Sequence, residues 1–188
     1  DKIAPIVKET GALLCIDCVS CMAGVNIDVD AWKLDVALAS VQKCFGIPPG
    51  LAVCAVSDAA FQKAEKVKNR GSYLDFIAHK KYGEKNEHPC TPPVPQMRAL
   101  KASLERILKD GPEAQYKRHD ELTQLIREWA LKQGFKIFSE EGYHSKTVVT
   151  VTNNLNIDVE KFVNDLFDKG FKIVNGYGEL KGKTFRMA

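Results

Sequence analysis

The sequence lacks long hydrophobic runs and a marked excess of charge of either sign. No apolar stretch approaches the ~20 residues that a helix needs to span a bilayer, and no secretory signal pattern opens the chain. The 188 residues carry a net charge of +3, which gives no reason to expect a nucleic-acid partner. We therefore expect a cytoplasmic protein that binds neither membranes nor nucleic acid.

The cysteine pattern is incomplete for a metal site. Cys15, Cys18 and Cys21 form C-x2-C-x2-C, the start of a ferredoxin-type cluster run, but no fourth cysteine followed by proline comes next. The remaining cysteines are scattered at positions 44, 54 and 90. We predict no metal site, and a non-enzymatic zinc or iron–sulfur protein built on the first three cysteines stays an alternative. Without a secretion signal, disulfides are not expected either.

The composition is that of an ordinary globular protein, with 45% hydrophobic and 27% charged residues. The length allows one large or two small domains. Gly111-Pro112 is the best boundary, because proline suits the first turn of a helix and Gly134 suits its end. We predict an α/β domain over residues 1–110 and a small α+β domain over residues 111–188.

Hydrophobic periodicity and turn residues predict the elements of both domains. In the first, strands are expected over 13–16, 36–40 and 51–56, and we expect the strands over 13–16 and 51–56 to be buried. Helices are expected over 3–9, 29–32, 58–68, 73–79 and 96–109. Asp28 or Asp30 would cap the helix over 29–32, and Asp58 would cap the helix over 58–68. In the second, a helix from Pro112 precedes strands over 135–138, 147–152, 171–174 and 184–187, with a helix capped by Asp158 among them.

The stretch from Leu13 to Gly50 carries the chemistry. Its apolar run ends in Asp17, and ligands of open α/β sheets sit outside the carboxyl ends of the strands. Asp17 therefore stands where a cofactor would bind. Lys43 follows 26 residues later, which leaves room for one helix and one further strand, and it precedes a rigid Gly-Ile-Pro-Pro-Gly turn.

Three motifs in this stretch together resemble one enzyme family. Asp17-x-x-Ser20, then Ser-x-Gln42-Lys43, then Pro-Pro-Gly50 are similar in order and spacing to the class V aminotransferases, which have fold type I of the pyridoxal-phosphate enzymes. The alanine–glyoxylate (serine–pyruvate) branch is the nearest match. The resemblance runs along the whole chain. It implies the C-terminal part of a large domain, a mostly parallel sheet with helices, followed by a truncated small α+β domain with an antiparallel sheet.

The same resemblance implies that a large N-terminal half is missing, including the phosphate-cradling turn and the ring-stacking aromatic residue. We therefore expect the sequence to be a fragment of the parent enzyme, or one piece of a cleaved enzyme, and to be inactive by itself.

The resemblance also implies roles for residues of the first domain, with pyridoxal 5′-phosphate as the cofactor. Lys43 would be the Schiff-base lysine and then the base that moves the substrate α-proton, as a readily deprotonated amine can. Asp17 would face the pyridine nitrogen and keep it protonated. Gln42 would touch the phosphate, and Ser20 would lie close to the site.

Two further residues, Thr91 and Arg186, are implied to bind groups at the site. Thr91 is similar to the threonine that reaches the phosphate of the neighbouring subunit, which implies a homodimer with sites at its interface. His88 occupies the place of an aromatic phenol in the family. Arg186 matches the arginine that binds the substrate α-carboxylate, a task for which its planar fork is suited.

Departures from the family pattern bear on the reaction. Val41 stands where a second serine is common, and Ala188 stands where glycine is expected. Gln42 replaces the histidine of cysteine desulfurases, which favours transamination. We expect amino acid and 2-oxo acid substrates, with an alanine- or serine-like donor and glyoxylate or pyruvate as acceptor. Phosphoserine transamination, or a lyase or desulfurase-like reaction, stays an alternative.

Overall fold

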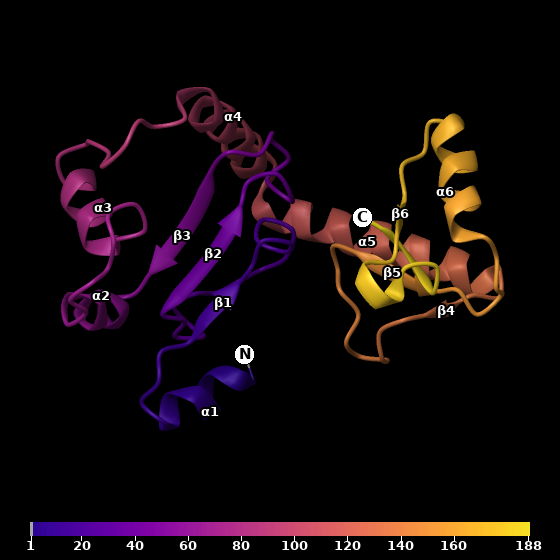
Figure 1. Ribbon diagram of the computed structural model, residues 1–188, viewed down its shortest axis with the longest axis horizontal. Helices are drawn as coiled ribbons and strands as arrows, with labels where there is room; N and C mark the ends of the chain where they lie inside the picture. Colours follow the sequence, from indigo (N-terminus) through magenta and orange to yellow (C-terminus); the bar gives the residue numbers. More distant parts are fainter. Residues whose placement is uncertain (1) are drawn as a thin grey trace. The chain divides into compact units, whose positions relative to one another are not determined.

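The computed structural model describes residues 2–188 and divides the chain into two compact units (Figure 1). The first unit ends at Lys109, and the second is Asp110–Ala188. The division falls one residue before the boundary that the sequence predicts. Each unit has its own sheet and its own hydrophobic clusters.

A three-stranded sheet forms the middle of the first unit (Figure 1). After helix α1 (Ile3–Glu9) the strands are β1 (Cys15–Asp17), β2 (Val36–Ser40) and β3 (Ala52–Val56), in the order β1-β2-β3. β1 is parallel to β2, whereas β3 is antiparallel to it. A short turn can join only antiparallel neighbours, and the turn of residues 41–51 does so here. The predicted helix 3–9 and the three predicted strands are confirmed, with shifts of one or two residues at β1 and β3.

The helices of the first unit are α2 (Asp58–Glu65), α3 (Phe76–Gly83) and α4 (Val94–Asp110). The predicted cap of α2 was wrong by one residue, because the Ser57 hydroxyl, and not Asp58, accepts from the Ala60 N–H at 3.1 Å. A hydroxyl at this position satisfies one of the free N–H groups of the first turn.

The predicted short helix over residues 29–32 was also wrong, since this segment forms turns. The Asp28 carboxylate accepts from the Ala31 N–H at 2.9 Å, as a cap would. However, Lys33 adopts a positive φ of 51°, which ends the helical path immediately.

The sheet of the first unit is covered on one face. Ala37 and Ala39 of β2 are fully buried in two apolar clusters that reach into the loops after β1 and β2. On the other face Cys15, Leu38 and Cys54 are exposed, and Leu38 is 39% exposed. The expectation that β1 and β3 are buried strands was therefore wrong. A run of apolar residues does not distinguish a strand covered on both faces from one covered on a single face.

Asp35 joins three elements of the first unit at the other end of the strands. Its buried carboxylate accepts from the Leu14 N–H at 2.7 Å, from the Ser57 hydroxyl at 2.9 Å and from the Lys8 ammonium. Burial by itself would raise the pKa of Asp35, but these hydrogen bonds outweigh it and hold that pKa below its ordinary value. The start of β1, the end of β3 and helix α1 are thereby tied together.

The second unit packs two helices against an antiparallel sheet. Helix α5 is Pro112–Lys132 and helix α6 is Val159–Asp168. The strands are β4 (Lys136–Ile137), β5 (Val149–Thr152), β6 (Val174–Asn175) and β7 (Thr184–Met187), in the order β4-β5-β7-β6, and a 3-10 turn, Gly178–Leu180, precedes β7. The predicted antiparallel sheet is confirmed, although β4 and β5 are shorter than predicted, and β6 overlaps the predicted strand 171–174 at Val174 alone.

The ends of these helices follow the expected chemistry. Pro112 lies at the start of α5, and Gly134 follows its end with a φ of 84°. Asp158 caps α6 by accepting from the Lys161 N–H at 3.0 Å. All three predicted end signals are confirmed.

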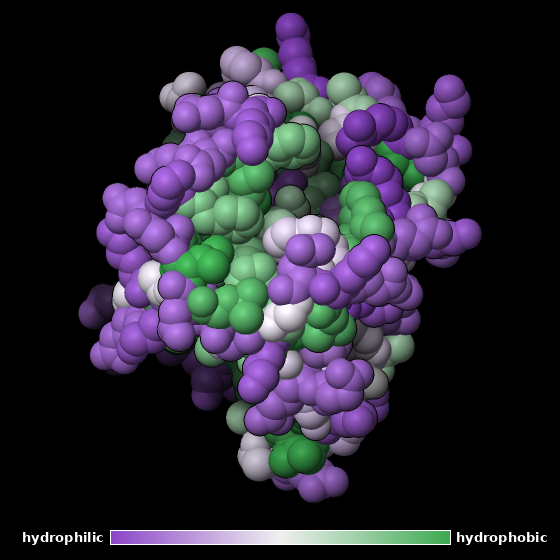
Figure 2. All heavy atoms as spheres, turned by 90° about the vertical axis from the view of Figure 1, so that its right-hand side faces the viewer, coloured by the Kyte–Doolittle hydropathy of each residue, from purple (hydrophilic) through white to green (hydrophobic). Residues whose placement is uncertain are grey.

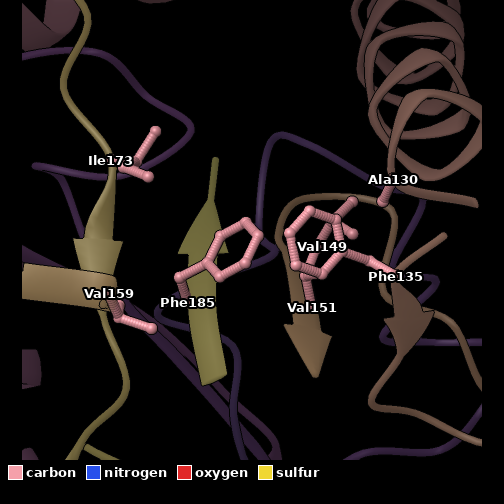
Figure 3. Packing of buried hydrophobic residues seen from close by; sticks show 7 residues of the cluster. All are labelled: Ala130, Phe135, Val149, Val151, Val159, Ile173 and Phe185. Atoms are coloured by element: carbon pink, nitrogen blue, oxygen red, sulfur yellow. The ribbon is translucent and has the colours of Figure 1, made fainter. Parts of the chain in front are cut away.

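The second unit has one hydrophobic core, in which aromatic rings pack together (Figure 3). Phe185 of β7 is fully buried at its centre, and its ring meets Phe135 and Phe162 edge-on, at centroid distances of 5.3 Å and 5.4 Å. Such pairs add about 0.5–1.5 kcal/mol each to the effect of burial. Beside this core a cavity of ≈ 440 Å³ lies between the end of α5 and α6, lined by Trp129, Phe162 and others. Figure 2 shows apolar surface, in green, bordered by hydrophilic side chains.

Candidate functional site

The loops that leave β1 and β2 lie at one edge of the first sheet. The two strands are parallel, and Asp17, the last residue of β1, pairs with Leu38 of β2. Parallel strands end at the same edge, where ligands of open α/β sheets bind. One oxygen of the exposed Asp17 carboxylate accepts from the Val19 N–H at 2.8 Å. The carboxylate is thereby oriented at the start of its loop.

Gln42 and Lys43 are exposed on the turn that follows β2. This turn is closed by backbone hydrogen bonds from Val41 to Leu51 at 3.2 Å and from Gly46 to Lys43 at 2.8 Å. Gly46 has a φ of 69°, a conformation that side chains rarely allow. The turn therefore holds the lysine backbone tightly and leaves its amine in the open.

Helix α4 supports this turn from behind. The Ser103 hydroxyl is buried and donates to the Phe45 carbonyl at 2.5 Å. Gly50 has a φ of 122°, and a Cβ there would lie 3.2 Å from the Gln96 side-chain amide. Glycine is therefore favoured at this position both by its conformation and by the close helix.

A direct contact joins the two loops. The Cys44 thiol, next to Lys43, donates to the Ser20 carbonyl at 3.6 Å. Met22 and Ala23 of the first loop also pack against the cluster of Val41 and its neighbours in the second. The structure thus brings the four predicted residues Asp17, Ser20, Gln42 and Lys43 to the same edge of the sheet.

Three thiols lie among these loops. Burial raises the pKa of Cys18 to about 11, and burial also raises the pKa values of Cys21 and Cys44. Among residues 2–188 no group of three Cys, His, Asp or Glu side chains could hold a metal ion. The geometry gives the alternative of a cysteine-bound metal or cluster no support.

Thr91 and His88 lie apart from this edge in the sequence, on the loop between α3 and α4. Both are exposed, and neither forms a hydrogen bond or ion pair with any residue in the part of the chain that the structure describes. The predicted role of Thr91 stays a prediction.

Arg186 lies in the second unit, on β7. It is partly buried, and its Nε and Nη2 atoms donate to the Asn175 carbonyl at 3.4 Å and 3.3 Å. Asn175 was missed by the sequence analysis. The Asn-Gly pair that it forms with Gly176 is a turn signal, but no sequence signal links it to Arg186.

Comparison with known proteins adds an independent finding. The profile of the family described as "Aminotransferase class-V" matches residues 1–176. An uncharacterized aminotransferase of Methanocaldococcus jannaschii is 35% identical over 99% of this chain and 49% of its own length. A protein of Synechococcus named "soluble hydrogenase, small subunit" is 33% identical over 96% of this chain and 47% of its own length.

The fold has close counterparts among solved structures. Alanine–glyoxylate aminotransferase from Nostoc sp. superposes with a TM-score of 0.90 at 29% identity, over 98% of this chain and 50% of that one. The chain thus spans about half the length of the proteins that it matches. Within the described residues, no helix has the length and apolar character needed to cross a membrane.

Proposed function

This chain belongs to the class-V aminotransferase family, and we propose that it is the C-terminal part of a pyridoxal-phosphate-dependent aminotransferase. The observation that carries the proposal is the contact between the Cys44 thiol and the Ser20 carbonyl. It places the loop of Asp17 beside the turn of Lys43, although the two residues are far apart in the sequence.

The side chains at this edge fit the needs of the cofactor. Pyridoxal phosphate requires an amine that reacts with its aldehyde, an acid opposite its ring nitrogen and hydrogen-bond donors for its phosphate. Lys43 offers the amine and Asp17 the acid. Gln42 and Ser20 offer hydrogen-bond donors for the phosphate. When bound, the cofactor supplies an electron sink for the negative charge that develops at the substrate α-carbon.

Each residue then has a task of its own. The Lys43 amine would hold the cofactor and, once free, would take the proton from the substrate α-carbon. The Asp17 carboxylate keeps a proton on the ring nitrogen. Gln42 and Ser20 orient the phosphate, and the Arg186 guanidinium binds the α-carboxylate of the amino or oxo acid.

The substrates that we propose are an alanine- or serine-like donor and glyoxylate or pyruvate as acceptor. The Nostoc structure, named for alanine and glyoxylate, supports this choice. A hydrogenase role, which the name of the Synechococcus relative suggests, has no specific observation in its favour.

We also propose a cytoplasmic homodimer in which Thr91 reaches the site of the partner subunit. Its exposed position, without a hydrogen-bond partner among residues 2–188, leaves it available for such a contact.

Borohydride reduction of the complete protein, followed by peptide mapping, tests the proposal. We expect a pyridoxyl group on Lys43 and none after Lys43→Ala, with Lys33→Ala, another exposed lysine of the same unit, as the matched control. An adduct on another lysine, or no adduct at all, would contradict the assignment. Assays with alanine, serine and phosphoserine as donors then decide between the substrate classes.

A further inference from the structure

The guanidinium of Arg186 uses one of its two edges within the protein. Nε and Nη2 lie on the same edge of the planar group, and both donate to the Asn175 carbonyl, at 3.4 Å and 3.3 Å. Arginine has five N–H donors in a fixed fork. The other edge, formed by Nη1 and the second hydrogen of Nη2, donates to no protein group among residues 2–188.

The Asn175 carbonyl is itself held in place by its own side chain. The Asn175 Oδ1 atom accepts from the Gly176 N–H and from the Gly182 N–H, each at 2.8 Å. The Gly176 N–H is also within hydrogen-bond distance, 2.8 Å, of the Thr184 carbonyl. These bonds orient the peptide unit that carries the carbonyl against the strand of Arg186.

The backbone packs closely around Gly176, the residue after Asn175. A Cβ on Gly176 would lie 2.0 Å from the Leu180 carbonyl oxygen and 2.6 Å from the Thr184 hydroxyl, which no side chain can accept. Strand β6 pairs with β7 through Val174 and Arg186 and through Asn175 and Phe185. The carbonyl that holds Arg186 is therefore fixed from both sides, by the sheet and by the loop.

We infer that Asn175 is a positioning residue for Arg186, and that a substrate carboxylate binds end-on, through Nη1 and Nη2. This inference rests on the proposed function for the identity of the ligand. With the Nε edge occupied, two parallel N–H···O bonds to a carboxylate are available only at the outer edge. The carbonyl also stops rotation of the guanidinium, so that the carboxylate meets a donor pair of fixed direction.

The test uses the complete protein with its arginine side chains labelled with ¹⁵N, and propionate as the probe, because it has a carboxylate but no amino or oxo group. The Arg186 signals are identified by their loss in Arg186→Lys. On saturation we expect the Nη signals of Arg186 to shift while the Nε signal stays in place. A shift of the Nε signal with unchanged Nη signals would overturn end-on binding, and this measurement needs no variant that must fold.

A variant pair tests the role of Asn175. Asn175→Ala removes the acceptor for the Gly176 and Gly182 N–H groups, so we expect the Kd for propionate to rise three- to tenfold. The KM for both amino and oxo acids should rise by a similar factor, with a smaller effect on kcat, because binding is weakened equally before and during reaction. An unchanged Kd would remove Asn175 from this role.

The matched control is Asn154→Ala. Asn154 also holds backbone groups of the second unit, accepting from the Lys136 N–H at 2.8 Å and donating to the Gly134 carbonyl at 2.9 Å. The Asn154→Ala variant should leave the Kd for propionate unchanged. An equal rise of this Kd in both variants would show a merely structural effect. If Lys43 binds no cofactor, the proposed function fails, but the propionate titration still reports on Arg186 and Asn175.

Discussion

The two units differ in how completely they cover their sheets. In the second, Phe185 and Val151 are fully buried, and residues of helices α5 and α6, Ala130 and Phe162 among them, pack in the same core. In the first, Ala37 is equally buried, yet Leu38, the next residue of the same strand, is 39% exposed. The second unit completes its own core, whereas the first leaves part of one sheet face exposed.

The candidate site residues are also distributed between the two units. The incompletely covered unit contains the amine and the carboxylate, in loops at its sheet edge. The self-contained unit contains Arg186 on a strand beside its core. In the proposed function, the groups that react lie on loops of the first unit, and the group that only binds lies on a strand of the second.

The largest effect should separate the two sheets. In the 188-residue chain, Phe185→Ala should lower the free energy of unfolding by about 3–5 kcal/mol, because it opens a cavity in a closed core. Leu38→Ala should cost less than about 1 kcal/mol, since much of this side chain is exposed. Urea unfolding followed by circular dichroism measures both. Equal costs would mean that the exposed face is covered in solution.

The buried Asp35 should make the first unit sensitive to acid. Asp35→Asn removes the charge that Lys8 pairs with, and we expect a loss of about 2–3 kcal/mol near neutral pH. Because the folded pKa of Asp35 lies below its unfolded value of about 3.9, its contribution is present above that value and is lost as the pH falls through the folded pKa. Unfolding free energies from pH 7 to pH 2 should therefore converge for the two proteins. A constant difference across this range would contradict the assignment.

The carboxylate at the sheet edge should affect the rate. Asp17→Asn in the complete protein keeps the size of the side chain but loses its charge, so kcat should fall by roughly ten- to a hundredfold, or ~1.5–3 kcal/mol. The thermal midpoint should change little, because Asp17 is exposed and its bonded partner, the Val19 N–H, can still donate to an amide oxygen. Steady-state kinetics with an unchanged kcat would remove Asp17 from this role.

The smallest effect should come from the rigid unit. Arg186→Lys keeps the charge and loses the planar fork, so the KM for amino and oxo acids should rise about tenfold, or ~1.4 kcal/mol. The absorption spectrum of the bound cofactor should remain as in the unchanged protein, since Lys43 and Asp17 belong to the other unit. If KM and kcat both stay the same, the carboxylate binds elsewhere.

Much of the fold could be predicted because local signals agree with it. The strand Val36–Ser40 was predicted residue for residue, and Pro112, Gly134 and Asp158 mark helix ends as their chemistry requires. Signals failed where two neighbouring residues compete for one task, as Ser57 and Asp58 do at the start of α2. They also failed where burial depends on what lies across a sheet face, since no local pattern contains that information.

The candidate site shows the same limit. The spacing of Asp17 and Lys43 between two apolar runs indicated a shared edge, and the strand register places both loops there. Asp35 was missed, because an aspartate between Leu34 and Val36 looks like any surface charge until Lys8 and Ser57 are brought to it from opposite directions. Asn175 was missed for a similar reason, since its contact with Arg186 depends on the pairing of β6 with β7.

The hairpin of β2 and β3 has a consequence for the time course of folding. The turn that carries Lys43 is closed by residues only ten positions apart, Val41 and Leu51, whereas the pairing of β1 with β2 spans about twenty. Hairpins form within microseconds, and contacts between distant residues generally follow local ones. We therefore expect the lysine to reach its final conformation before the aspartate arrives beside it. On this order, the β1 loop with Asp17 joins the turn of Lys43 after that turn has formed.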